Sequence, residues 1–175
     1  TFSYLNQIVP QRRETDPEVI LQYLHTRVLE ELHRQQIKDP TGEGIDLALV
    51  SIDPQARTLQ FAGARRPLWI FRGQELMAVE GDKMSLAQEK AAVFSGHQYQ
   101  LQQGDAVYLF LDGVTNQFGG EQNRKFSVKR LKELLEGLQD QPMPQQKAAL
   151  AKELAAWQGD EELTDDMLLV GLKLD

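Results

Sequence analysis

The hydrophobic pattern of the chain changes its period twice, and this constrains the fold more than any other feature. Up to about residue 37 the apolar residues recur at helical spacing, from residue 45 they alternate or form short runs, and from residue 126 the helical spacing returns. Turn sequences separate the apolar runs, namely Asp53-Pro54, Arg72-Gly73-Gln74 and Gln103-Gly104-Asp105. Consecutive strands joined by tight turns pair in antiparallel fashion.

The pattern predicts helices at both ends of a block of strands. The expected helices cover residues 2–9, 17–37, 126–138 and 145–157. The expected strands cover residues 45–52, 57–63, 68–71, 75–79, 97–101, 106–111 and 167–174. Because the helices are grouped and do not alternate with the strands, we expect an α+β fold. In this fold two stacked antiparallel sheets are flanked by helices, as an αββα sandwich.

Size and composition exclude several classes of protein. A length of 175 residues suggests one domain, and the absence of cysteine excludes disulfides, zinc–thiolate sites and thiol catalysis. A net charge of −7 argues against a nucleic-acid partner. We expect the local basic clusters to be solvated, namely Arg12-Arg13, Arg65-Arg66 and the group Arg124, Lys125, Lys129, Arg130 and Lys132.

Nucleophilic and nucleotide-binding motifs are missing from the sequence. It contains no G-x-S-x-G elbow, no Walker loop and no G-x-G-x-x-G segment. His25 and His33 fall on the amphipathic segment 17–37, so we expect both on the surface. Gly119-Gly120 is predicted to be a flexible loop.

Carboxylates are the stronger candidates for chemistry. The apolar run V-Y-L-F-L ends at Asp112-Gly113, which is either a simple turn or the end of a strand that holds a metal ligand. Asp165 and Asp166 open the last apolar run, where they are either part of an acidic surface loop or a second pair of ligands. Neighbouring residues of a strand point to opposite faces, so only one of this pair can readily face a given site. Aspartates on adjacent strand ends would suit Mg²⁺ or Mn²⁺ and the hydrolysis of a phosphate ester.

The order of several motifs resembles the PPM-type protein phosphatases of the stage II sporulation protein E family. The motifs are D-L-A-L-V-S-I-D, F-A-G-A-R-R-P-L-W-I-F-R-G, G-D-K-M-S-L, V-Y-L-F-L-D-G-V-T-N-Q-F-G-G, R-K-F-S-V-K-R-L-K-E-L-L and T-D-D-M-L-L-V-G-L. The resemblance implies a two-metal Mn²⁺ or Mg²⁺ site, with Asp112 and one of Asp165 and Asp166, more readily Asp165, as ligands. It also implies hydrolysis of phosphoserine or phosphothreonine on a regulatory phosphoprotein of bacterial signalling, of the class of anti-sigma-factor antagonists.

The sequence also departs from the family. The resemblance places further ligands in a G-D segment and a D-x-x-G-H-G segment, and neither occurs here. Residues 1–9 resemble the end of the helix that the second segment opens, so we expect residues 1–175 to be a PPM-type domain truncated at its N-terminus, with its first strands missing. We therefore expect the chain alone to be inactive, and either to self-associate through exposed sheet edges and apolar faces or to be poorly soluble. The alternative is a catalytically inactive, phosphatase-like binding module.

The expected location is the cytoplasm. No apolar run approaches the roughly 20 residues that span a bilayer, and the first residues lack the basic start of a signal peptide. The chain also begins without Met, so we expect it to be part of a longer protein, and the resemblance implies that a sensor or membrane region precedes it.

Overall fold

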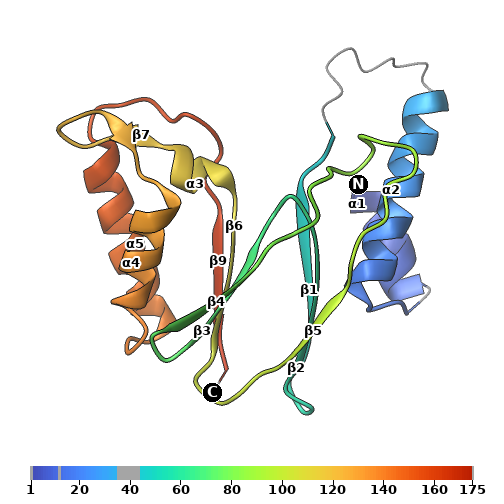
Figure 1. The fold of residues 1–175 in the computed structure, drawn as a ribbon, viewed down its shortest axis with the longest axis horizontal. Coiled ribbons are helices and arrows are strands. Elements are labelled where there is room, and N and C mark those ends of the chain that lie inside the picture. Colours follow the sequence, from blue (N-terminus) through green and yellow to red (C-terminus); the bar gives the residue numbers. More distant parts are fainter. Residues whose placement is uncertain (1, 12, 35–43, 175) are drawn as a thin grey trace. The chain divides into compact units, whose positions relative to one another are not determined.

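The computed structural model describes residues 2–11, 13–34 and 44–174 (Figure 1). The chain forms two compact units, Thr1–Leu68 with Val79–Leu101 and Trp69–Ala78 with Gln102–Asp175. Residues 35–37, the end of a predicted helix, lie outside the described residues. Within the described part of the chain, no helix is both long enough and apolar enough to cross a membrane.

The first unit is a three-stranded antiparallel sheet covered by a helix. Its strand order is β1 (Leu47–Asp53), β2 (Thr58–Ala64) and β5 (His97–Gln100). The helix α2 (Pro17–Arg34) packs on β1 and β2. Apolar side chains of α2 and the sheet share a core with residues of the segment that precedes β5, including Leu21, Leu24, Ala62, Leu86 and Phe94.

The helix α2 begins where the sequence predicts. The Oδ1 atom of Asp16 accepts the N–H of Glu18 at 2.9 Å, which satisfies one of the free donors of the first turn. Pro17 is the first residue of the helix, where its missing N–H costs nothing.

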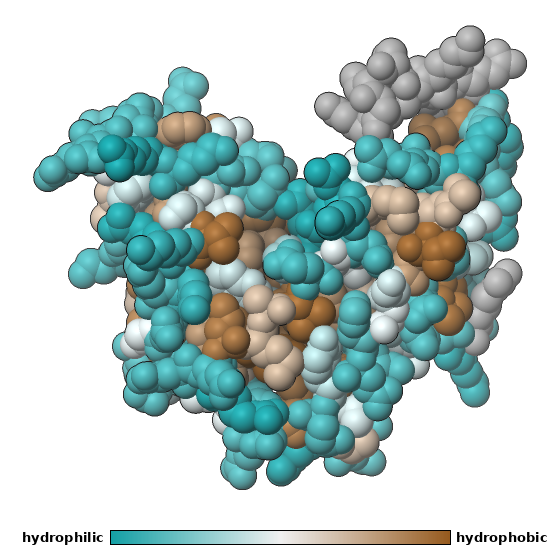
Figure 2. All heavy atoms as spheres, viewed as in Figure 1, coloured by the Kyte–Doolittle hydropathy of each residue, from teal (hydrophilic) through white to brown (hydrophobic). Residues whose placement is uncertain are grey.

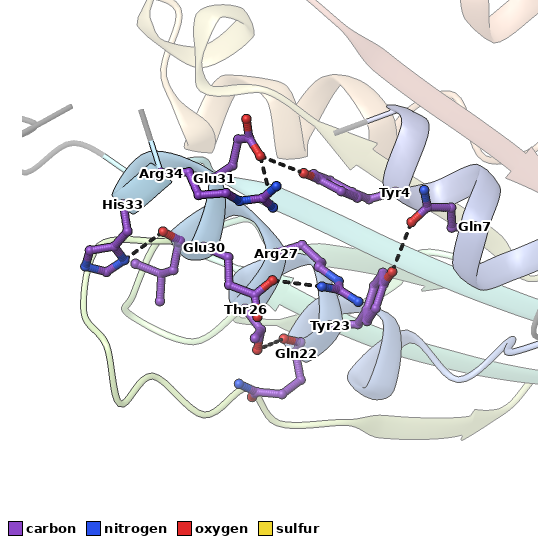
Figure 3. Close-up of polar contacts among 11 residues, drawn as sticks. Tyr4, Gln7, Gln22, Tyr23, Thr26, Arg27, Glu30, Glu31, His33 and Arg34 are labelled. Carbon is purple, nitrogen blue, oxygen red and sulfur yellow. Dashed lines mark hydrogen bonds and ion pairs between the residues drawn. The ribbon is translucent and has the colours of Figure 1, made fainter. Parts of the chain in front are cut away.

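The first helix lies against α2. The short helix α1 (Phe2–Asn6) continues as a π-helical turn, η1 (Gln7–Gln11). Two contacts join these segments to α2: the hydroxyl of Tyr4 donates to Glu31 at 3.4 Å, and that of Tyr23 donates to Gln7 at 3.3 Å (Figure 3).

The prediction that His25 lies on the surface is wrong, whereas His33 is exposed as predicted. The His25 side chain is 2% exposed and packs edge-on against the ring of Phe94, with 5.6 Å between the ring centres. Its Nδ1 accepts the N–H of Ala87 at 3.2 Å. The periodicity of α2 could not show this, because the segment that covers His25 is more than fifty positions further along the chain.

The basic clusters are solvated with one exception. Arg13, Arg65 and the group from Arg124 to Lys132 are exposed as predicted, and Arg12 lies outside the described residues. Arg66 is the exception: its side chain is only 16% exposed and forms an ion pair with Asp46 at 3.1 Å. Tertiary pairing of this kind leaves no mark in the local sequence.

The second unit contains a four-stranded sheet and the helices that pack on it. The strand order is β4 (Glu75–Val79), β3 (Leu68–Arg72), β6 (Ala106–Phe110) and β9 (Leu169–Lys173). The strands β6 and β9 pair in antiparallel fashion. Side chains of the helices α4 (Val128–Glu136) and α5 (Met143–Gln158) join those of the sheet in one core, which includes Trp69, Phe71, Tyr108, Leu131 and Leu150.

The buried polar side chains of Tyr108 and Asp105 in this unit are paired. The hydroxyl of Tyr108 donates to Gln146 Oε1 at 2.5 Å and accepts from Gln139 Nε2 at 3.0 Å. Burial raises the pKa of the Tyr108 phenol, so the neutral donor is the form that the core favours. The carboxylate of Asp105, a residue predicted only as part of a turn, is 1% exposed and forms an ion pair with Arg72 at 2.8 Å.

The expected antiparallel sheets flanked by helices are confirmed, but the segment after Asp112 differs from the prediction. It forms a one-turn helix, α3 (Asp112–Asn116), and a small antiparallel hairpin of β7 (Phe118–Gly119) and β8 (Arg124–Lys125). The prediction of a flexible loop at Gly119-Gly120 is wrong. A Cβ atom on Gly119 would overlap the carbonyl oxygen of Trp157, and that oxygen accepts the N–H of Gly120 at 2.8 Å. These glycines permit close contact with the end of α5.

Candidate metal centre

Asp112 stands at the end of a buried strand. Leu111, with an extended backbone, follows β6, and Asp112 is the first residue of α3. Val114 and Thr115 anchor α3 because both are buried, and the Thr115 hydroxyl donates to the carbonyl oxygen of Asp112 at 3.1 Å. Asp112-Gly113 is therefore the start of a helix and not a hairpin turn.

The pairing of β6 with β9 brings the acidic segments together. Phe110 lies opposite Leu169, and beyond the ladder the N–H of Leu111 donates to the carbonyl oxygen of Leu168 at 3.0 Å. A metal site shared by aspartates at adjacent strand ends requires these two strands to be neighbours, and they are. The contact continues to Gly113, where a Cβ atom would overlap the carbonyl oxygen of Asp166 and approach that of Asp165 to 3.2 Å.

We expect Gly113→Ala to separate the two acidic segments. The added methyl group has no room against the backbone of Asp166, so the chain must shift there, at a cost of about 1–3 kcal/mol in the free energy of unfolding. Urea denaturation measures this cost. Gly137→Ala is the matched control, because a Cβ there meets nothing closer than the Glu133 carbonyl oxygen at 3.6 Å. Equal stabilities of the two variants would contradict the tight contact.

The carboxylates at this contact are suited to a hard cation. Asp165 and Asp166 are exposed and Asp112 is half-buried. One oxygen of Asp165 accepts the N–H of Asp166 at 2.7 Å, which restricts the direction of that carboxylate. Carboxylate oxygens are the donors that Mg²⁺ and Mn²⁺ prefer. Residues 2–11, 13–34 and 44–174 contain no group of three or more His, Cys, Asp or Glu side chains placed to hold a metal ion, so the acids here fit only part of a coordination shell.

Gln117 is a residue of this region that the sequence does not reveal. It directly follows α3 and is 0% exposed, although a glutamine in a polar, glycine-rich segment is typical of a surface loop. Its side chain is hydrogen bonded to the segment that leads to Asp165. No local pattern distinguishes such a buried amide from a solvated one.

Comparisons with known proteins agree with this architecture. A sequence profile described as "Stage II sporulation protein E (SpoIIE)" matches residues 3–175. The SiaA-PP2C domain of Pseudomonas aeruginosa has 25% sequence identity and a TM-score of 0.85, and the match covers 99% of this chain and 67% of that one. A search of curated protein sequences gives no match.

Two further solved structures share the fold. One is the phosphatase domain of the cell fate determinant SpoIIE from Bacillus subtilis, presoaked with Mn, at 19% identity and a TM-score of 0.59, with 99% of this chain and 73% of that one covered. The other is the catalytic domain of the serine threonine protein phosphatase PstP in complex with two manganese ions, at 15% identity and a TM-score of 0.68, with 99% and 79% covered.

Proposed function

Since the chain belongs to the SpoIIE family of PP2C-type phosphatase domains, which are metal-dependent protein phosphatases, we propose that it serves the hydrolysis of phosphoserine or phosphothreonine on a regulatory protein of bacterial signalling. The observation that carries the proposal is the contact of Gly113 with the backbone of Asp165 and Asp166. It sets two acidic segments side by side at the ends of paired strands.

Asp112 and Asp165, or Asp166 in place of the latter, would hold Mn²⁺ or Mg²⁺. Two structural relatives support this choice of ion, one presoaked with Mn and one in complex with two manganese ions. When bound, such an ion supplies an activated water and neutralises phosphate charge. The role of the protein itself is to hold the carboxylates in place. The helix α3 fixes Asp112, and the N–H of Asp166 orients the Asp165 carboxylate.

A basic groove next to α3 supports a phosphoprotein as the partner. Four cationic side chains, Arg124, Lys125, Lys129 and Arg130, line a groove of about 680 Å³ together with two acidic ones, Glu121 and Glu133, so positive charge predominates there. The groove adjoins α3, because Lys125 Nζ donates a hydrogen bond at 3.0 Å to the side chain of Asn116, the last residue of α3. A phosphorylated or acidic segment is the partner that such a surface attracts.

A phosphatase-like binding module remains the second candidate. The observation that favours it is the lack, in the described residues, of three acidic or histidine side chains placed around one ion. The test is Mn²⁺-dependent release of phosphate from a phosphoserine peptide. Release that requires Asp112 and either Asp165 or Asp166 supports the enzyme. Binding of the phosphopeptide without release, in every folded version of the protein, supports the module.

We also propose that the chain associates with itself through β9. This strand lies at one end of its sheet, and Leu168, Val170 and Leu172, at alternate positions, are 54%, 51% and 43% exposed. Figure 2 shows hydrophobic patches among the hydrophilic side chains of one face of the molecule. A strand edge of this kind can pair with the same edge of a second copy about a twofold axis.

Val170→Lys should therefore shift the chain toward the monomer in sedimentation velocity at tens of micromolar protein. The lysine places a charge in the edge that would pair. Val93→Lys is the control, because Val93 is 71% exposed but belongs to the first unit and to no strand. A wild-type chain that sediments as a monomer at every concentration would contradict the proposal.

A further inference from the structure

The side-chain amide of Gln117 joins the two acidic segments of the candidate metal centre. Its Nε2 atom donates to the carbonyl oxygens of Phe118 at 3.0 Å and Glu162 at 2.9 Å. Its Oε1 atom accepts the N–H of Thr164 at 3.1 Å. The amide thus binds the backbone immediately before Asp165.

These three hydrogen bonds permit only one orientation of the amide. Both protons of Nε2 have an acceptor, and Oε1 faces a donor. A flipped amide would set Nε2 against the N–H of Thr164 and Oε1 against two carbonyl oxygens. Because Gln117 is 0% exposed, water cannot replace a lost partner, and each loss leaves a buried polar group unpaired.

The backbone of Gln117 is itself fixed by three hydrogen bonds. Its N–H donates to the carbonyl oxygen of Gly113 at 3.1 Å. Its carbonyl oxygen accepts the N–H of Phe126 at 2.8 Å and the indole Nε1–H of Trp157 at 3.2 Å. Gly113 is also the residue that lies against the second acidic segment. Gln117 therefore transmits the position of α3 to that segment.

We infer that Gln117 is a positioning residue of the metal centre, whose amide sets the place of Asp165 relative to Asp112. The inference rests on the proposed function for the identity of the ion, but its geometric part stands on the hydrogen bonds alone. Residues that orient metal ligands typically change metal affinity by about 10–100-fold when they are replaced.

The test compares two buried glutamines of the same unit. Gln117→Leu removes all three side-chain bonds and keeps a side chain of similar size. Gln146→Leu is the matched control: Gln146 is 1% exposed, accepts from Tyr108 at 2.5 Å and donates to the Gln141 carbonyl oxygen at 2.9 Å. We expect each change to lower Tm by about 2–8 °C, since each removes buried hydrogen bonds.

Two readouts separate positioning from stability. In the metal-free chain, hydrogen exchange of the backbone amides of residues 164–166 should accelerate about 10-fold in Gln117→Leu and stay unchanged in Gln146→Leu. In a Mn²⁺ titration followed by NMR, the concentration that half-broadens the amides of Gly113 and Asp166 should rise about 10-fold in Gln117→Leu only.

Equal exchange and equal Mn²⁺ dependence in the two variants would overturn the inference. If Mn²⁺ broadens neither amide, in the wild-type chain or in a version extended through the family's G-D and D-x-x-G-H-G segments, the proposed function fails, while the exchange rates still decide the role of Gln117. If Gln117→Leu does not fold, Thr164→Pro is the substitute variant. Thr164 is exposed, and proline removes the backbone N–H that donates to Gln117 Oε1. Unchanged exchange at residues 165 and 166 in that variant would overturn the inference as well.

Discussion

Asp112→Asn is expected to lower Mn²⁺-dependent turnover by about 100-fold or more, in a longer version of the chain that carries the family's G-D and D-x-x-G-H-G segments upstream of residue 1. The amide has nearly the shape of the carboxylate but no negative charge, so it holds a divalent cation poorly. A metal ion contributes several kcal/mol to the transition state of phosphate hydrolysis, and each 1.36 kcal/mol corresponds to a tenfold change in rate. Phosphate release from an aryl phosphate and from a phosphoserine peptide measures the loss.

The fold should survive this substitution. Asp112 opens a one-turn helix whose anchors, Val114 and Thr115, are untouched, so Tm should change little. Asp160→Asn is the control: it removes the same charge from an exposed residue of the loop that leads to the second acidic segment. A normal rate for Asp112→Asn, or an equal loss for Asp160→Asn, would refute the assignment of Asp112 as a metal ligand.

The 175-residue chain by itself is expected to hydrolyse an aryl phosphate at least 100-fold more slowly than the longer version in saturating Mn²⁺. A two-metal hydrolase needs carboxylates that bridge both ions and lower the pKa of the shared water. In its described residues the chain has Asp112 and Asp165, with Asp166 as a neighbour, but no set of three ligands around one ion.

The comparison of turnover by the short and the longer protein needs a control for folding, and one result would contradict the prediction. Both proteins should be matched for folding by their thermal unfolding transitions, so that a low rate cannot be attributed to unfolded chain. The Mn²⁺ concentration should be raised until the rate no longer changes, because a partial site binds weakly. Robust turnover by the short chain would show that its own residues complete the centre, and the role expected for the G-D and D-x-x-G-H-G segments would be wrong.

Most secondary structure of this protein could be predicted from its sequence, because each element buries a face with a regular period. The alternation near Leu49 and the apolar run at Tyr108 both became strands, and the Asp16-Pro17 start of α2 lies where capping rules place it. The helix α3 was missed because one turn is too short to show a period. The hairpin around Gly119 depends on contact with Trp157, which no local rule contains.

Some residues of the candidate site could likewise be recognised from local sequence patterns, and others depend on tertiary contacts. Asp112 and Asp165 could be proposed as ligands because each lies where an apolar run meets a polar segment, and the pairing of the two runs brings these segments together. His25 and Arg66 were assigned to the surface, since an isolated helix or turn gives no sign of what will cover it. Gln117 was not detected at all.

The sequence by itself determined the longer strands and helices and the two acidic segments at the ends of strands, because these depend on patterns that extend over a few neighbouring residues. Only the tertiary structure decided how the acids are held. The contact of Gly113 with Asp166 and the bonds of Gln117 to Glu162 and Thr164 join residues more than forty positions apart. Such contacts arise when packing excludes water and a buried amide must find its partners in the backbone that happens to lie against it.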